Sequence, residues 1–82
     1  MIMIPETAGD MLKLKRKDLK LKQHEVAERA GISIRQYQKF ESGEQDIMSS
    51  SFRIAGRVVE ALELDIAEFF KNYSGAVASE KK

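Results

Sequence analysis

Residues 23–43, QHEVAERAGISIRQYQKFESG, contain two short helical patterns separated by a tight turn. Ala27 is small enough to let two helices cross closely, and Gly31 tolerates the positive φ angle that a chain often needs where a helix ends. Ser33 has the side chain of a typical N-cap for the second helix, and Gly43 stops that helix. The stretch therefore predicts two helices joined by a sharp turn.

Helical patterns also flank this stretch on both sides. Thr7 and Asp65 are placed to cap the first and last helices, and one serine of the triplet 49–51 should cap the fourth. No segment alternates between apolar and polar residues over a sustained length, so we expect an all-α fold, a compact bundle of five helices without strands. The residues expected to face its core are Ala8, Leu12, Leu19, Val26, Ala27, Ala30, Tyr37, Phe40, Phe52, Ala55, Val58, Val59, Leu62, Ile66, Phe69 and Phe70.

The chain of 82 residues is long enough for one small domain with a single core. It contains no cysteine and one histidine, so we expect neither a metal site nor a cofactor. No apolar run approaches the roughly 18 residues of a membrane span, and residues 1–4 are too short for a signal peptide. We therefore expect a cytoplasmic protein without a membrane partner. We divide the chain into an N-terminal arm (1–7), a helical domain (8–70) and a flexible tail (71–82), for which an arm or dimer strap is the alternative.

Charge is distributed unevenly along the chain, although its net value is only +1. Residues 10–43 carry nine Lys or Arg against five Asp or Glu, a balance of +4. Residues 44–70 carry two arginines against six acids, a balance of −4. This asymmetry suggests that the basic half binds a polyanion, although a charged surface must fall somewhere on any soluble protein.

The sequence resembles a helix-turn-helix of the phage-repressor/Cro type, also called the Xre family. The matching residues are the run 23–33, Tyr37, the run 40–43, the run 61–65 and Phe69. The resemblance covers about residues 8–70 and implies a lambda-repressor-like DNA-binding domain with its helix-turn-helix at the second and third helices. A plain five-helix bundle would also explain Ala27 and Gly31. It would not explain why the exposed face of the third helix carries basic and amide side chains and no acid.

In such proteins the third helix enters the major groove of double-stranded DNA and the second lies across the backbone. The resemblance implies base contacts from Ile34, Arg35, Gln38 and Lys39. It implies phosphate contacts from Lys20, Lys22, Gln23, Ser33 and Gln36. Arg35 is the expected main base contact because arginine forks onto guanine. Ile34 would either pack on a thymine methyl group or be partly buried against the second helix, and the lysines would otherwise form a solvated basic face.

Arg16 and Glu41 match a pair that in this family joins the first helix to the end of the third. We expect this structural ion pair to brace the recognition helix, and two independent surface charges are the alternative. Tyr37 stands where the family usually has Ile or Val, so its hydroxyl must find a partner or reach the surface.

Operators are usually bound by twofold dimers with one recognition helix per half-site, so we expect a homodimer. Its surface would consist of Leu64, Ile66, Phe69, Phe70 and Tyr73. The two adjacent phenylalanines cannot both face one small core, so one is available to a partner. Alternatively, both tuck under the first helix together with Ile4.

These features predict a sequence-specific transcriptional regulator, a repressor or controller, that binds a palindromic operator as a dimer through the major groove. It would be a bacterial or phage-derived, nucleoid-associated protein, and no small-molecule ligand is evident. The alternative is a protein-interaction module on the same fold, such as an antitoxin-like subunit or adaptor, that docks through its acidic half. An enzyme is not expected, because the only histidine, His24, lies inside the DNA-reading unit and no P-loop is present.

Overall fold

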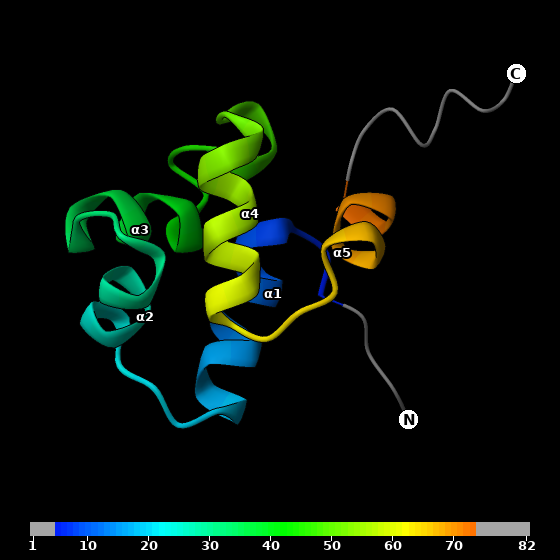
Figure 1. Cartoon of the computed structure of the whole chain (residues 1–82). Coiled ribbons are helices and arrows are strands. Elements are labelled where there is room, and N and C mark those ends of the chain that lie inside the picture. Colours follow the sequence, from blue (N-terminus) through cyan, green and yellow to red (C-terminus); the bar gives the residue numbers. More distant parts are fainter. Residues whose placement is uncertain (1–4, 74–82) are drawn as a thin grey trace, which may run out of the picture.

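The computed structural model describes residues 5–73, which form five α-helices and a short 3₁₀ helix. In chain order the elements are α1 (Ala8–Asp18), α2 (Gln23–Ala30), α3 (Ile34–Ser42), η1 (Ile47–Ser49), α4 (Phe52–Ala61) and α5 (Ile66–Tyr73). Helix α4 crosses the centre of the molecule, with α2 and α3 on one side, α5 on the other and α1 behind it (Figure 1). Residues 5–73 contain no strand, which confirms the expected all-helical class.

Polar side chains cap four of these helices as the sequence predicts. Thr7 Oγ1 accepts a hydrogen bond from the amide of Asp10 (3.0 Å) at the start of α1. Ser33 Oγ accepts from the third amide of α3 (3.1 Å), and Ser51 Oγ accepts from Ile54 N (3.2 Å) in α4. Asp65 Oδ1 accepts from Glu68 N (3.0 Å) in α5. Each cap satisfies an amide that has no partner within its helix, which explains why the helices begin at these residues.

The core lies where the apolar faces of the helices converge. Its largest fully buried side chains are Tyr37, Phe40, Leu12, Ile47, Leu62, Val26, Val58 and Val59. Ile47 belongs to η1, an element that the sequence did not predict, because a single turn of helix leaves too few residues for a periodic pattern. Asp46 caps this turn by accepting a hydrogen bond from Met48 N (3.0 Å).

The structure corrects the expected core position of Phe52 and the expected dimer contact of Phe69. Phe52 was expected in the core, but its side chain is 67% exposed because it is the first residue of α4 and extends beyond the helices that cover that face. Its ring instead packs edge-on against Phe70, with the ring centroids 5.5 Å apart. Phe69 is 3% exposed and packs inside its own chain, so it belongs to the core and not to an accessible dimer surface.

Helices α1 and α3 approach each other most closely at Gly9. A Cβ atom at this position would lie 2.6 Å from the carbonyl oxygens of both Phe40 and Glu41. Only a glycine lets the first turn of α1 rest directly on the backbone of α3. This contact sets the position of the end of α3 relative to the rest of the domain.

Helix α1 begins at Ala8, where the domain was expected to start, whereas the last helix extends past the expected end of the domain. Helix α5 continues to Tyr73, three residues past the expected domain end at residue 70. The Tyr73 hydroxyl donates a hydrogen bond to the carbonyl of Pro5 (2.9 Å), which joins α5 to the segment before α1. The rest of the expected tail (74–82) and the start of the expected arm (1–4) lie outside the described residues.

Candidate nucleic-acid interface

The turn between α2 and α3 has the backbone geometry that the sequence predicts. Gly31 adopts a left-handed conformation (φ 74°, ψ 30°) that ends α2, and the amide of Ile32 donates to the carbonyl of Ala27 (3.0 Å). Ala27 is 2% exposed and lies in the core. Gly43 ends α3 in the same left-handed region (φ 87°). Gly31 thus ends α2, while the Ser33 cap and Gly43 define the two ends of α3.

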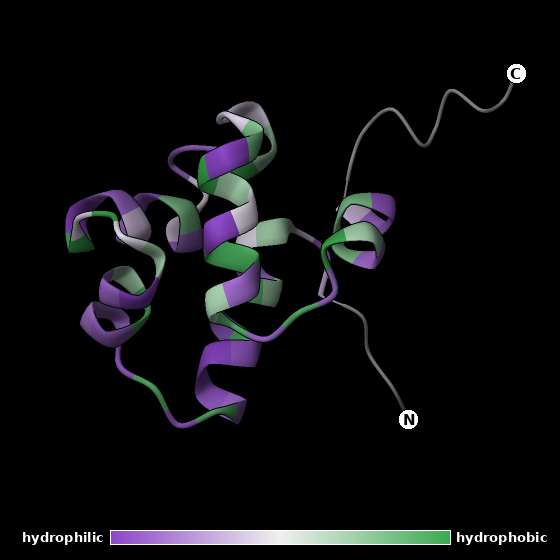
Figure 2. Ribbon diagram, viewed as in Figure 1, coloured by the Kyte–Doolittle hydropathy of each residue, from purple (hydrophilic) through white to green (hydrophobic). Residues whose placement is uncertain are grey.

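The outer face of α3 is open and free of acidic side chains up to its last turn. Ile34 is 43% exposed, Arg35 and Gln38 are exposed, and Lys39 is half-buried. A shallow depression of about 490 Å³ runs along this face, lined by Arg35, Gln38, Lys39, Ser42 and Glu44. The exposure of Ile34 favours a surface role over burial against α2. Hydrophilic residues also dominate the ribbon of α2 and the end of α1 on this side of the molecule (Figure 2).

The residues expected to contact phosphates occupy two different settings. Lys20 and Lys22 are exposed in the segment between α1 and α2, and Lys20 has a positive φ of 60°. The backbone N–H of Lys22 donates to Glu25 Oε1 (2.7 Å) at the start of α2, and Lys22 is exposed there. Ser33 is exposed, and its hydroxyl retains its proton as a donor after accepting the cap hydrogen bond.

The other two members of that set are already held by hydrogen bonds within the protein. The side-chain Nε2 of Gln36 donates to Gln45 Oε1 (3.0 Å), which joins α3 to the loop after it. Gln23 is half-buried at the start of α2, between α1 and α3. It contacts both Glu41 and Gln38, as described below.

A cluster of polar side chains lies behind α3. Arg16 Nε donates to Glu41 Oε2 and Arg16 Nη2 donates to Glu41 Oε1 (3.2 Å), so the expected ion pair is present as a two-pronged contact. The Tyr37 hydroxyl finds its partner in Glu41 Oε2 (2.7 Å). Arg16 also donates to the carbonyl of Leu21 (3.0 Å), and Gln23 Nε2 donates to Glu41 Oε1 (3.0 Å). The carboxylate of Glu41 therefore receives donors from α1, α2 and α3 and joins the three helices.

These contacts determine the charge states of the cluster. Burial by itself would raise the pKa of Glu41, but the hydrogen bonds from Arg16, Tyr37 and Gln23 outweigh it and lower that pKa. The hydrogen bond to Glu41 raises the pKa of Arg16. Burial, followed by the hydrogen bond to the anionic Glu41, strongly raises the pKa of Tyr37. Glu41 is therefore ionised and Tyr37 protonated at neutral pH.

A second hydrogen bond extends the cluster to the exposed face. Gln38 Nε2 donates to Gln23 Oε1 (3.0 Å). Gln38, which was expected to contact a base, is therefore hydrogen-bonded to Gln23, which was expected to contact a phosphate. The sequence did not predict this contact, because the two residues lie 15 positions apart on separate helices and no pattern specifies their approach. Gly9 was missed for the same reason, since only the packing of α1 on α3 gives it a role.

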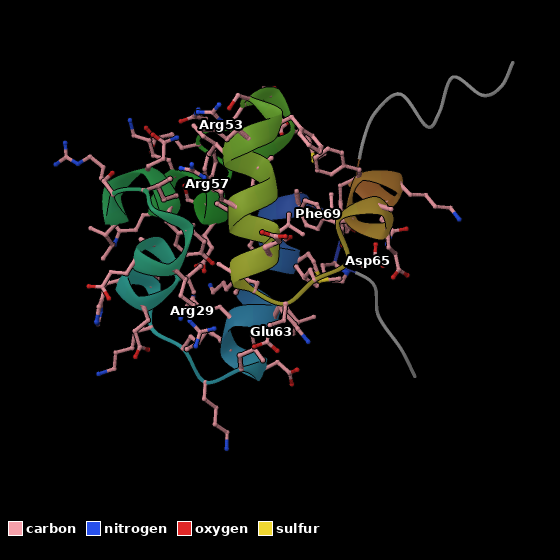
Figure 3. All side chains as sticks on the ribbon, viewed as in Figure 1. Arg29, Arg53, Arg57, Glu63, Asp65 and Phe69 are labelled. Atoms are coloured by element: carbon pink, nitrogen blue, oxygen red, sulfur yellow. The ribbon has the colours of Figure 1, made fainter. Side chains whose placement is uncertain are left out.

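Three arginines of α4 and α2 lie at other positions around the helix-turn-helix (Figure 3). Arg53 and Arg57 lie on the side of α4 that faces α3, and Arg29 lies near Glu63 (Figure 3). Arg57 Nη1 is 3.7 Å from the place where a Cβ atom of Gly31 would be. Arg29 Nη1 is 4.0 Å from Glu63 Oε2 and donates to the carbonyl of Ala61 (3.4 Å), which joins α2 to the end of α4. The sequence analysis gave these arginines no role.

Residues 5–73 contain neither a cluster of potential metal ligands nor a helix that could cross a membrane. No group of three or more potential metal-binding side chains comes together there. No helix in this part of the chain has the length and hydrophobicity needed to cross a membrane.

Comparison with known families assigns the chain to a family without using this geometry. A family model described as helix-turn-helix matches residues 12–69, more than half of the chain. The match begins in α1 and ends in α5, so it includes every residue of the exposed α3 face. No match was found among curated proteins.

Proposed function

Since the chain belongs to the helix-turn-helix family of the Cro/repressor (Xre) type, and is thus a DNA-binding protein, we propose that it regulates transcription by reading a palindromic operator as a homodimer. The observation that carries this proposal is the exposed face of α3, which carries basic and amide side chains on a helix that hydrogen bonds join to α1 and α2. Such a face fits the major groove of B-form DNA, where each base pair shows a distinct pattern of donors and acceptors. A regulator of this kind would act in the cytoplasm.

Each side chain on this face has a role within the proposal. Arg35 is exposed near the start of α3 and would donate two hydrogen bonds to guanine. Ile34 would pack on a thymine methyl group. Gln38 and Lys39 would reach bases further along the groove. Lys20, Lys22, Gln23, Ser33 and Gln36 would contact phosphates on either side.

The exposed rings at the start of α4 and in α5 support the dimer. Phe70 is half-buried and makes an edge-to-face contact with Phe52, which is 67% exposed. Leu64, Ile66 and Tyr73 are also half-buried. We assign this surface to a second copy of the chain, because a twofold dimer would place two α3 helices one turn of DNA apart, at about 34 Å. Phe52→Ser should shift the protein to monomers in sedimentation velocity with unchanged helix content, and an unchanged dimer would contradict the assignment.

The experiment that tests the function is selection of bound sequences from a random duplex pool. We expect a palindromic consensus with half-sites about one helical turn apart. Arg35→Ala should then relax one base position and cost about 1–3 kcal/mol of binding free energy. Lys22→Ala should weaken binding to all sequences alike and reduce the salt slope by about 1. Lys71→Ala, which removes an exposed charge on α5, is the matched control. Because Lys71 lies next to the proposed dimer surface, sedimentation velocity checks that this variant is still a dimer, and with an unchanged dimer it should change neither quantity.

The second candidate function is a protein-interaction module on the same fold. The exposure of Phe52 favours it, because a large apolar side chain on the surface also suits a protein partner. Glu60 is exposed on α4, Glu63 is exposed in the segment that follows it, and both offer acidic docking positions. Binding that enriches no sequence and disappears as salt rises would favour this candidate, since phosphate attraction alone behaves in that way.

A further inference from the structure

Two hydrogen bonds connect the buried carboxylate of Glu41 to the exposed face of α3. Gln23 Nε2 donates to Glu41 Oε1, and Gln38 Nε2 donates to Gln23 Oε1, and the donor–acceptor distance is 3.0 Å in both. Glu41 is 8% exposed, Gln23 is half-buried and Gln38 is exposed, so the chain of amides runs from the core to the surface. Gln38 on the exposed face of α3 is thereby linked to the negative charge of Glu41.

The ionised state of Glu41 determines which way the side-chain amides of Gln23 and Gln38 are oriented. An ionised carboxylate can only accept hydrogen bonds, and the donors from Arg16 and Tyr37 stabilise Glu41 in that form. The amide of Gln23 must therefore turn its NH₂ group toward Glu41 and its oxygen outward. The amide of Gln38 must in turn give one N–H to that oxygen.

We propose that Glu41, acting through Gln23, fixes the orientation of the Gln38 amide and thereby makes Gln38 a specificity-determining residue that selects adenine over guanine. The inference rests on the proposed DNA-binding function. In the fixed orientation Gln38 offers its carbonyl oxygen and one remaining N–H to the groove. Adenine matches both groups, because it presents an N6 amino donor beside the N7 acceptor. Guanine presents two acceptors, O6 and N7, so its O6 would face the Gln38 oxygen.

The side-chain amides of Gln36 and Gln45 form a second pair near this face, and no charged group among residues 5–73 fixes their orientation. Gln36 donates to Gln45 Oε1 (3.0 Å), and no hydrogen bond joins either side chain to a charged group of the described residues. Both amides can turn over together and keep their hydrogen bond. Gln36 therefore serves as the matched control for the base preference of Gln38, while loss of its proposed phosphate contact should weaken binding to all operators alike.

The experiment uses the full chain and the operator obtained from the selection. Dissociation constants are measured for operators that carry each base pair at each position, with wild type and with Gln38→Met, Gln23→Met, the double variant and Gln36→Met. Methionine keeps the length of the side chain and removes its hydrogen bonds. Circular dichroism and thermal unfolding confirm that each variant is folded.

We expect Gln38→Met to remove an adenine preference at one position of each half-site, worth about five- to hundred-fold in affinity. Gln23→Met should weaken binding to every operator by a common factor, as the loss of a phosphate contact would, and should also reduce that one preference for adenine over guanine toward unity. The double variant should match Gln38→Met at that position. Replacing the adenine with purine, which lacks the 6-amino group, should weaken wild type and leave Gln38→Met unchanged.

Failure of the inference and failure of the function give different results. If wild type enriches no sequence, the proposed function fails and the inference falls with it. If wild type reads an operator but Gln23→Met keeps its full preference for adenine over guanine, the inference alone is overturned. It is also overturned if Gln38→Met changes no position, or if Gln36→Met removes the same preference.

Discussion

Replacing Gly9 with alanine should separate α1 from α3. The added Cβ atom would lie 2.6 Å from the carbonyl oxygens of Phe40 and Glu41, whereas real Cβ contacts are essentially never below 3.0 Å. The helices must therefore move apart by at least about 0.4 Å, the difference between these two distances. Both obstructing atoms belong to the backbone, so no side-chain rotation can relieve the contact.

The magnitude follows from two opposing effects. Inserting a methyl group into a well-packed contact costs about 1–3 kcal/mol, and we take the upper part of this range because backbone atoms must move. Alanine also favours a helix over glycine by about 1 kcal/mol. We therefore expect Gly9→Ala to lower the free energy of unfolding by about 1–2 kcal/mol.

Gly56 in α4 provides the matched control. A Cβ atom there meets nothing within 4 Å, so Gly56→Ala should gain about 0.5–1 kcal/mol from helix propensity alone. The two variants should differ by about 1.5–3 kcal/mol, or about 6–24 °C in melting temperature for a domain of this size. Thermal and urea unfolding followed by circular dichroism measure both. If Gly9→Ala is as stable as Gly56→Ala, the close approach of α1 to α3 is refuted.

Three further predictions concern hydrogen bonds. Tyr37→Phe removes a 2.7 Å hydrogen bond to the carboxylate of Glu41 and should cost about 1.5–3 kcal/mol in urea unfolding, and a loss under 0.5 kcal/mol would contradict this contact. Because the pKa of Glu41 is lower in the folded state, its stabilisation exists above the unfolded pKa of about 4.3 and is lost as the pH falls through the folded value. Glu41→Gln should therefore flatten the acid limb of a plot of unfolding free energy against pH, and an unchanged slope would show that Glu41 does not titrate in this way. Tyr73→Phe removes the 2.9 Å hydrogen bond to Pro5 O and should cost about 0.5–1.5 kcal/mol in thermal unfolding, and an unchanged stability would contradict this contact.

Features that depend on neighbouring residues could be predicted from the sequence. The caps by Thr7, Ser33 and Asp65 involve amides three residues away, so the pattern of residue types is sufficient to place them. Gly31 ends α2 in the left-handed conformation for the same reason, since the strain of a side chain at positive φ is local. Lys20 also has a positive φ, which no pattern of residue types indicates in a non-glycine residue.

Features that depend on how helices meet could not be predicted in this way. Periodicity placed Phe52 on the buried face of α4, because it counts residues along one helix and not where the neighbouring helices end. The roles of Gly9 and of the contact between Gln23 and Gln38 depend on distances between helices. The pair of Arg16 and Glu41 was expected only through the family resemblance, since 25 positions separate the two residues.

The buried charge of Glu41 is difficult to explain by stability alone. Desolvation of an ion pair often offsets its attraction, and replacing such a pair with apolar residues of similar volume is often neutral or stabilising. An apolar residue at this position could hold α1 against α3, but it could not orient an amide. The carboxylate accepts hydrogen bonds from three helices and passes a fixed direction to Gln23, at the edge of the face that would meet DNA. A requirement to orient the exposed amides explains a charge at this position, whereas a requirement for packing does not.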